Sequence, residues 1–252
     1  MPRRLLGLIA FRDEMRFLPG FLESVAPHVD GIVALDDGSV DGSREYVAAH
    51  PAVLEVLHVP PGTHADNLDS VLRRMLIEAA WEHGADWLLG IDADERLETG
   101  FRSRAEQELD RADALGAQAM WVDFKELWDP GHYRSDGIWG RKRKACLFRS
   151  SREHVFDDRR VHSFWASVPE PQGGWPLAEL RIYHLRMIEP ADRVARAQRY
   201  ERIDPDHVWQ TIGYDYLLDE TGLELTAVEP ERAYLTAGGG PAAAAAAASA
   251  PG

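Results

Sequence analysis

Apolar residues in the first part of the chain recur in two patterns that alternate with each other. Continuous apolar runs, which are typical of strands buried on both faces, occupy residues 5–11, 31–35 and 87–91, and a further strand is predicted at 53–59. Segments with a helical pattern lie between them, at residues 17–25, 42–50 and 68–83. Because strands and helices alternate, the sequence predicts an α/β fold with a mostly parallel sheet covered by helices.

The second part of the chain is less regular. The predicted strands and helices lie at residues 117–124, 144–148 and 180–184, and at residues 102–115, 190–202 and 206–218. Residues 126–139 are rich in aromatic residues and glycine without a clear period, so we expect a loop there. After Thr236 the chain contains no large apolar residue, which predicts a disordered tail. The expected organisation is therefore a main domain over 1–205, a C-terminal helical extension over 206–236 and a tail over 237–252.

Two acidic clusters interrupt the apolar pattern, each directly after a predicted strand. Asp36-Asp37-Gly38-Ser39 follows the strand at 31–35, and Asp92-Ala93-Asp94-Glu95 follows the strand at 87–91. In open α/β sheets, ligands bind at the carboxyl ends of the strands. We therefore expect both clusters to contribute to one ligand site.

The chemistry of the two clusters differs. The carboxylates of Asp36 and Asp37 can accept hydrogen bonds from a nucleotide base and from ribose hydroxyls, although an acidic turn that caps the next helix is the alternative. Asp92 and Asp94 are alternate residues of an extended segment and share one face. Such paired carboxylates suit Mg²⁺ or Mn²⁺, and either ion can hold a diphosphate. A solvated acidic turn is the alternative here too.

Composition narrows the class of protein. Apolar residues make up 45% of the 252 residues, which is enough for a sizeable core in one globular domain. The formal net charge of -14 argues against nucleic acid as a partner, because an acidic surface repels phosphate backbones. No apolar run is long enough to be a transmembrane segment, so we expect a cytoplasmic protein, with peripheral membrane contact left open.

The two acidic clusters together resemble a known family. The segments ALDDGSVDGS and WLLGIDADERL are similar to the Asp-Asp-Gly-Ser nucleotide motif and the Asp-x-Asp metal motif of the family 2 glycosyltransferases, which have the GT-A fold. The opening LIAFRDEMRFLPGFLESV resembles the family's first strand and helix, with Arg12-Asp13-Glu14 where a Lys-Asn-Glu-type segment is usual. The resemblance is close over residues 5–96 and looser over 97–205. It implies an inverting, metal-dependent transfer of a sugar from a nucleoside-diphosphate sugar to a glycan, lipid or small-molecule acceptor.

The resemblance also implies roles for individual residues. Asp36 and Asp37 would bind the base and ribose, and Asp94 would be the main metal ligand. Asp92 would contact the ribose, or the metal through water. The other residues expected around the sugar nucleotide are Ala10, Phe11, Arg12, Glu14 and Ala93. Arg73, on the predicted helix before the strand at 87–91, is a further candidate by its position, with ion pairing to Glu78 on the same helix as the alternative.

A histidine is expected to complete the metal site. His184 ends a predicted strand, and in many GT-A enzymes a histidine at that place is a metal ligand. Imidazole is a plausible ligand for Mn²⁺ and less favoured for Mg²⁺. His162 is the alternative.

An inverting transfer needs a carboxylate that takes the proton from the acceptor hydroxyl. The predicted loop at 126–139 lies where the family usually places its acceptor contacts and this base. Asp136 is the chosen base, and Glu126, Asp123 and Asp129 remain open. The aromatic residues of this loop could stack on a sugar or simply pack the loop: Trp128, Tyr133 and Trp139.

Two other functions are alternatives, and the sequence lacks the feature that would favour each of them. A sugar nucleotidyltransferase would carry a glycine-rich, basic phosphate loop after the first strand, where this chain has Arg12-Asp13-Glu14-Met15. A non-catalytic nucleotide-sugar binding module would be favoured by a degraded Asp-x-Asp pair, but both aspartates are present.

The basic run Arg141-Lys142-Arg143-Lys144 could neutralise a diphosphate or form a solvated charged face.

Overall fold

The computed structural model describes residues 3–59, 69–156 and 164–236. Two predictions, the metal ligand His162 and the tail at 237–252, lie outside these residues. Within them, the strands form one ten-stranded mixed sheet. No helix among the described residues has both the length and the apolar character needed to cross a bilayer.

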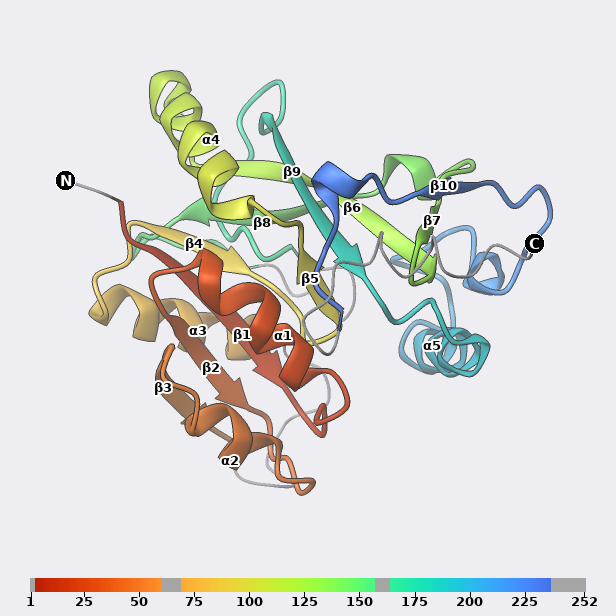
Figure 1. Ribbon diagram of the computed structural model, residues 1–252, viewed down its shortest axis with the longest axis horizontal. Coiled ribbons are helices and arrows are strands. Elements are labelled where there is room, and N and C mark those ends of the chain that lie inside the picture. The colour runs from red at the N-terminus through yellow and green to blue at the C-terminus, as the bar shows by residue number, and fades with distance from the viewer. Residues whose placement is uncertain (1–2, 60–68, 157–163, 237–252) are drawn as a thin grey trace.

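The first half of the sheet is parallel and carries the predicted strands. Its order is β3-β2-β1-β4 (Figure 1), with bounds β1 (Leu5–Phe11), β2 (Ile32–Asp36), β3 (Val53–His58) and β4 (Trp87–Gly90). Every residue of β2 and β4 is buried, as continuous apolar runs require. In Figure 1, helix α1 lies in front of these strands and α3 behind them. The helices of this half are α1 (Leu18–Val25), α2 (Ser43–Ala48) and α3 (Asp69–Glu82), with a 3₁₀ turn at Ala26–His28.

The second half of the sheet is antiparallel apart from one pair. Its strands are β5 (Glu95–Leu97), β6 (Ala119–Asp129), β7 (His132–Arg134), β8 (Arg143–Arg149), β9 (Leu177–His184) and β10 (Leu225–Ala227). The exception is β6 and β9, which run parallel. Helix α4 (Phe101–Leu115) contacts β9, and α5 (Pro190–Ile203) follows β9 in the chain. Further 3₁₀ turns lie at Trp139–Arg141, Asp215–Leu217 and Pro230–Arg232.

The predicted loop at 126–139 is wrong over half of its length. Strand β6 continues to Asp129, and β7 pairs with it in an antiparallel hairpin. Of these residues, Glu126 pairs with His184 of β9, a strand more than fifty residues later in the sequence, whereas Leu127 and Asp129 pair with β7. No local pattern shows the pairing with β9.

The predicted helix at 206–218 is also wrong, since only Asp215–Leu217 is helical and forms a 3₁₀ turn. The carboxylate of Asp204 accepts the backbone N–H groups of the three residues 208–210. This side-chain cap replaces the hydrogen bonds that a helix would make. The predicted helical extension therefore contains short turns and β10, which joins the main sheet by pairing with β7.

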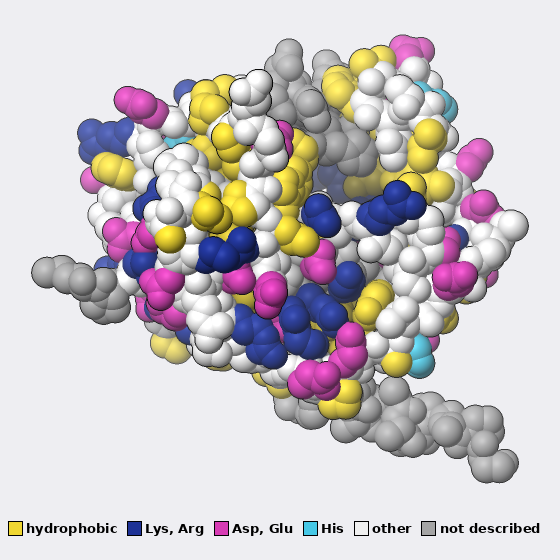
Figure 2. Space-filling model, turned by 90° about the horizontal axis from the view of Figure 1, so that it is seen from above, with side chains coloured by type: hydrophobic (Ala, Val, Ile, Leu, Met, Phe, Trp, Pro, Cys, Tyr) yellow, Lys and Arg dark blue, Asp and Glu magenta, His cyan; other side chains and the backbone are white. Residues whose placement is uncertain are grey.

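The surface mixes charges of both signs. Figure 2 shows Lys and Arg side chains lying among Asp and Glu side chains across the face seen from above. The net charge of -14 therefore does not make that face uniformly acidic.

Candidate active site

The two acidic clusters lie at the same edge of the sheet. Strand β1 pairs with β2 on one side and with β4 on the other, and all three run parallel. Asp36 is the last residue of β2, and Asp92 follows the end of β4 by two residues. The sheet thus brings together the clusters that the sequence predicted to share a site.

Asp36 has a buried carboxylate that points into the protein. Its Oδ1 accepts the backbone N–H of Ser39 at 2.9 Å, and its Oδ2 lies 2.9 Å from Nδ1 of His58. The parallel register of β2 and β3 sets Asp36 beside His58. This carboxylate therefore fixes the turn after β2.

Asp37 is the more accessible of the two aspartates. Its backbone N–H donates to the carbonyl of Phe11, and its carboxylate lies 3.7 Å from the guanidinium of Arg12. Ala10 and Phe11 form the end of β1 beside this turn. The predicted base-binding residues are thus neighbours in the structure, and their contact with a nucleotide stays a prediction.

The loops that follow β1 and β2 are tied together by side chains. The backbone N–H of Glu14 donates to Oγ of Ser43 at 3.1 Å, and that of Asp13 donates to Oγ of Ser39 at 3.0 Å. In return, the Asp13 carboxylate accepts the N–H of Val40 at 2.8 Å. These hydrogen bonds hold the two loops against each other.

Asp92 is held by a lysine that also binds a buried glutamate. Nζ of Lys144 lies 2.9 Å from Oδ2 of Asp92 and 2.5 Å from Oε1 of Glu95. Glu95 in turn accepts the backbone N–H of Asp92 at 2.9 Å. Burial acts to raise the pKa of Asp92, but the charge and the hydrogen bond of Lys144, together with the charge of Arg73, lower that pKa below its usual value. Asp92 is thus an ionised and half-exposed carboxylate.

Asp94 is a buried carboxylate that faces two cationic side chains. Its Oδ2 accepts a hydrogen bond from Nε of Arg186 at 2.5 Å and lies 3.3 Å from Nε2 of His184. Burial would raise the pKa of Asp94, yet these two partners hold it well below its usual range. Arg186 also pairs with Glu14 at 2.5 Å, which connects the first loop to the metal motif.

His184 is placed between two carboxylates by strand register. In β9 it is the partner of Glu95 of β5 and of Glu126 of β6. Its Nδ1 lies 2.5 Å from Oε2 of Glu126, and its Nε2 faces Asp94. Burial by itself would lower the pKa of His184, but the charges of Glu126 and Asp94 raise it to about 9.

The residues at this edge fit a divalent cation in part. A carboxylate oxygen of Asp94 and an imidazole nitrogen of His184 lie side by side, and this donor pair suits Mn²⁺. Among the described residues, no three His, Cys, Asp or Glu side chains are grouped so that they could hold a metal ion. A cation at Asp94 and His184 would therefore need further ligands, which phosphate oxygens and water commonly supply.

Arg96 is a residue that the sequence analysis missed. Its side chain is buried under the acidic turn and donates to the carbonyl groups of Ala93, Glu95 and Phe17 at 2.7–3.0 Å. It thereby ties the turn that carries Asp92 and Asp94 to the start of α1. Burial lowers the pKa of Arg96 to about 10, so the side chain keeps its charge at neutral pH.

The predicted basic run has an alternating arrangement. Arg141 and Arg143 are exposed, whereas Lys142 and Lys144 turn inward to Glu126 and Glu95. Alternate residues of an extended segment face the same side, so this spacing could have predicted that Lys142 and Lys144 both point inward. The same spacing relates Arg186 to His184.

Arg73 of the predicted donor site lies on α3. Its guanidinium donates to the carbonyl of Phe164 at 2.9 Å and lies over the ring of Trp165. Its charge also helps to lower the pKa of Asp92, with a smaller effect than that of Lys144. Arg73 is therefore close enough to act on the acidic edge.

Asp136 does not join this cluster through any contact found in the described part of the chain. It forms a two-pronged ion pair with Arg134, at 2.7 and 3.0 Å, and accepts the backbone N–H of Glu224. These bonds lower the pKa of Asp136, the Arg134 hydrogen bonds most of all. The aromatic rings of Trp128 and Trp139 are buried against the same Arg134, which favours packing over sugar stacking.

We expect Asp136→Asn to lower the free energy of unfolding by about 1.5–3 kcal/mol, because it removes hydrogen bonds to a charged, buried arginine. Urea denaturation measures this loss. A general base would behave differently, with transfer reduced about 10²–10⁴-fold and stability kept. Unchanged stability combined with lost transfer would restore Asp136 as the base.

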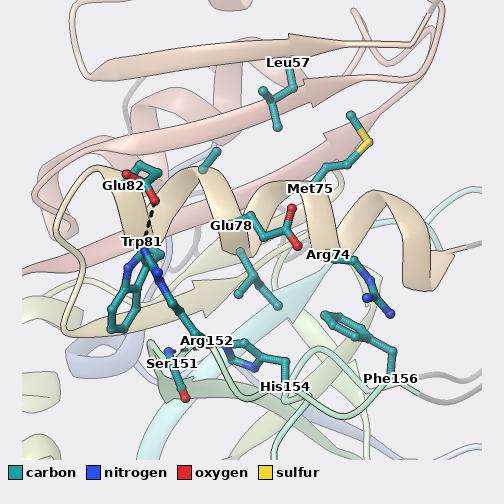
Figure 3. Close-up of a pocket in the computed structure, with 12 residues that line it drawn as sticks. Leu57, Arg74, Met75, Glu78, Trp81, Glu82, Ser151, Arg152, His154 and Phe156 are labelled. Atoms are coloured by element: carbon teal, nitrogen blue, oxygen red, sulfur yellow. Dashed lines mark hydrogen bonds and ion pairs between the residues drawn. The ribbon is translucent and has the colours of Figure 1, made fainter.

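A cavity of about 760 Å³ lies away from the predicted residues. Figure 3 shows it between α3 and the segment 151–156, with Arg152 and Glu82 paired at one end. None of the aspartates of the two acidic clusters lines it. We therefore assign the site to the sheet edge rather than to this cavity.

Comparisons with known proteins agree with this architecture. No known protein-family profile matches the chain. An uncharacterised protein of Mycobacterium tuberculosis is 26% identical over 235 residues, which cover 87% of this chain and 57% of that protein. A TPR repeat-containing protein of Synechococcus elongatus is 38% identical over 104 residues, which cover 41% of this chain and 24% of that protein. The chain therefore spans little more than half the length of the first relative.

The crystal structure of S. aureus TarS has a similar fold. It superposes on 86% of this chain and 42% of its own with a TM-score of 0.50, at 12% sequence identity. The predicted fold class is thereby confirmed: the chain has an α/β fold of the GT-A type, with a central sheet covered by helices.

Proposed function

We propose that the chain is a metal-dependent glycosyltransferase that moves a sugar from a nucleoside-diphosphate sugar to a glycan, lipid or small-molecule acceptor. The observation that carries the proposal is the Asp94–His184 pair. This pair lies at the edge of the sheet formed by the carboxyl ends of the parallel strands, where the Asp36-Asp37 turn also lies. The GT-A fold supports this assignment, because the same edge of open α/β sheets binds ligands.

In this proposal the residues of the edge divide into two groups. Asp37 and Arg12 border the nucleotide, and Asp94 with His184 holds Mn²⁺ or Mg²⁺. A bound divalent cation would stabilise the negative charge that develops on the departing diphosphate. The inverting course and the identity of the carboxylate base stay predictions.

Arg186 supports a cation site at Asp94 by its present position. It donates to the oxygen atom of Asp94 that His184 also faces, so this oxygen already attracts positive charge. The second bond of Arg186, to Glu14, gives the guanidinium a place to stay if a metal ion replaced it at Asp94. The arrangement is therefore compatible with exchange of one cation for another.

Release of nucleoside diphosphate tests the proposed function. The full chain is incubated with UDP-, GDP- and dTDP-sugars and Mn²⁺, and the products are separated by anion-exchange chromatography. Water can replace the unknown acceptor, so slow hydrolysis of one donor is enough. We expect release from at least one donor and none with EDTA. Donor binding without any release would instead indicate a non-catalytic binding module.

A further inference from the structure

Glu126 and His184 come together although 58 positions separate them in the sequence. Strands β6 and β9 run parallel, and their register makes these two residues direct partners. The Glu126 side chain has no exposed surface, and its Oε2 lies 2.5 Å from Nδ1 of His184. The opposite ring nitrogen, Nε2, faces Asp94 at 3.3 Å. One imidazole ring thus connects Glu126 to the predicted metal ligand.

Two further cations surround Glu126. Nζ of Lys142 lies 2.7 Å from its Oε1, and Nη1 of Arg196 lies 3.7 Å from the same oxygen. A carboxylate paired in this way stays ionised and can only accept hydrogen bonds. Nδ1 of His184 lies 2.5 Å from this carboxylate and 3.3 Å from Nη1 of Arg196, so the closer acceptor favours a hydrogen atom on Nδ1. In the neutral ring, the lone pair is then on Nε2, on the side of Asp94.

We propose that Glu126 is a positioning residue, which fixes the orientation and tautomer of His184 so that Nε2 is presented beside Asp94 to a divalent cation. This inference rests on the proposed metal-dependent function. It replaces the role of catalytic base that the sequence suggested for Glu126. A carboxylate behind a ligating histidine typically changes metal affinity by about 10–100-fold when it is lost.

The opposing explanation is that Glu126 only completes a buried ion pair. Glu98 provides a matched comparison, because it is also a fully buried glutamate. It is paired with Arg232 and accepts the backbone N–H of Arg181, and none of these partners belongs to the site. Glu126→Gln and Glu98→Gln therefore disturb buried glutamates of the same size at different places.

Calorimetric titration of the metal-free full chain with Mn²⁺ tests the proposal. Glutamine has nearly the size of glutamate, but its amide can donate as well as accept, so it no longer dictates the tautomer of His184. We expect Glu126→Gln to weaken Mn²⁺ binding about 10–100-fold. Glu98→Gln should bind Mn²⁺ like the unaltered chain. Circular dichroism confirms that each variant is folded.

Two further measurements separate positioning from a general loss of structure. Nitrogen-15 NMR of the Zn²⁺-loaded protein should show hydrogen on Nδ1 of His184 in the unaltered chain and a changed signal in Glu126→Gln. Glu126→Asp keeps a carboxylate that can only accept hydrogen bonds, so it should lose less Mn²⁺ affinity than Glu126→Gln. It replaces Glu126→Gln in the titration if the glutamine variant does not fold.

Equal Mn²⁺ affinity of Glu126→Gln and the unaltered chain would overturn the proposal, as would an equal loss in Glu98→Gln. A larger loss in Glu126→Asp than in Glu126→Gln would overturn it too. If the unaltered chain binds no Mn²⁺, the proposed metal-dependent function fails as well. Mn²⁺ binding by the unaltered chain therefore distinguishes failure of the positioning role from failure of the proposed metal-dependent function.

Discussion

Replacing Asp94 by asparagine is expected to reduce donor turnover by at least about 100-fold. Asp94 is the buried carboxylate that faces both His184 and Arg186, and the proposed function places the cation on it. Metal ions supply several kcal/mol of charge stabilisation in such reactions, and each 1.36 kcal/mol changes a rate tenfold. The measurement is the rate of nucleoside diphosphate release with saturating Mn²⁺.

Asp113→Asn is a suitable control for this prediction. Asp113 is also paired with arginines, Arg3 and Arg149, but it contacts no residue of the proposed site. This variant should retain the rate of the unaltered chain. If Asp94→Asn releases nucleoside diphosphate as fast as Asp113→Asn, the metal is not held at Asp94.

The second large effect is expected on stability. Arg96→Met should lower the free energy of unfolding by about 3 kcal/mol or more, because it removes three hydrogen bonds from a charged donor, each worth about 1.5–3 kcal/mol. The carbonyl of Phe17 keeps the backbone N–H of Phe21, whereas the carbonyls of Ala93 and Glu95 lose the guanidinium. Methionine is apolar and flexible, so it can fill the space without replacing the hydrogen bonds. Urea denaturation followed by circular dichroism measures the change.

The same substitution should also weaken Mn²⁺ binding, because the carbonyls belong to the turn that carries Asp94. The matched control is Arg152→Met, since Arg152 is an exposed arginine paired with Glu82. A surface substitution of this kind changes stability by about 0.5 kcal/mol or less. An Arg96→Met protein as stable as Arg152→Met would show that Arg96 does not hold the turn.

The parallel half of the sheet could be predicted from the sequence because its signals are local. Each of its buried strands is a continuous apolar run, and a polar cluster marks the end of the strand. The rule that ligands bind at the carboxyl ends of parallel strands then placed Asp36 and Asp92 at one edge. Burial of Asp36 against His58 could not be predicted, because it depends on the register between β2 and β3.

The antiparallel half was less predictable because its pairing is not local. Glu126 was assigned to a loop, so its contact with His184 on another strand could not be foreseen. The cap formed by Asp204 replaced a predicted helix, although Gly213 inside the predicted segment was a local signal against one. Cations that neutralise the acidic cluster, such as Lys144, appeared in the sequence only as part of a charged run.

Calorimetric titration of the unaltered chain with UDP, GDP and dTDP, each with Mn²⁺ and with EDTA, tests the central claim most directly. The account predicts that at least one nucleotide binds in the presence of Mn²⁺ and that EDTA removes this binding. The two acidic clusters would then hold the base and the diphosphate of one ligand. Failure of all three nucleotides to bind, or equal binding with EDTA, would contradict the account.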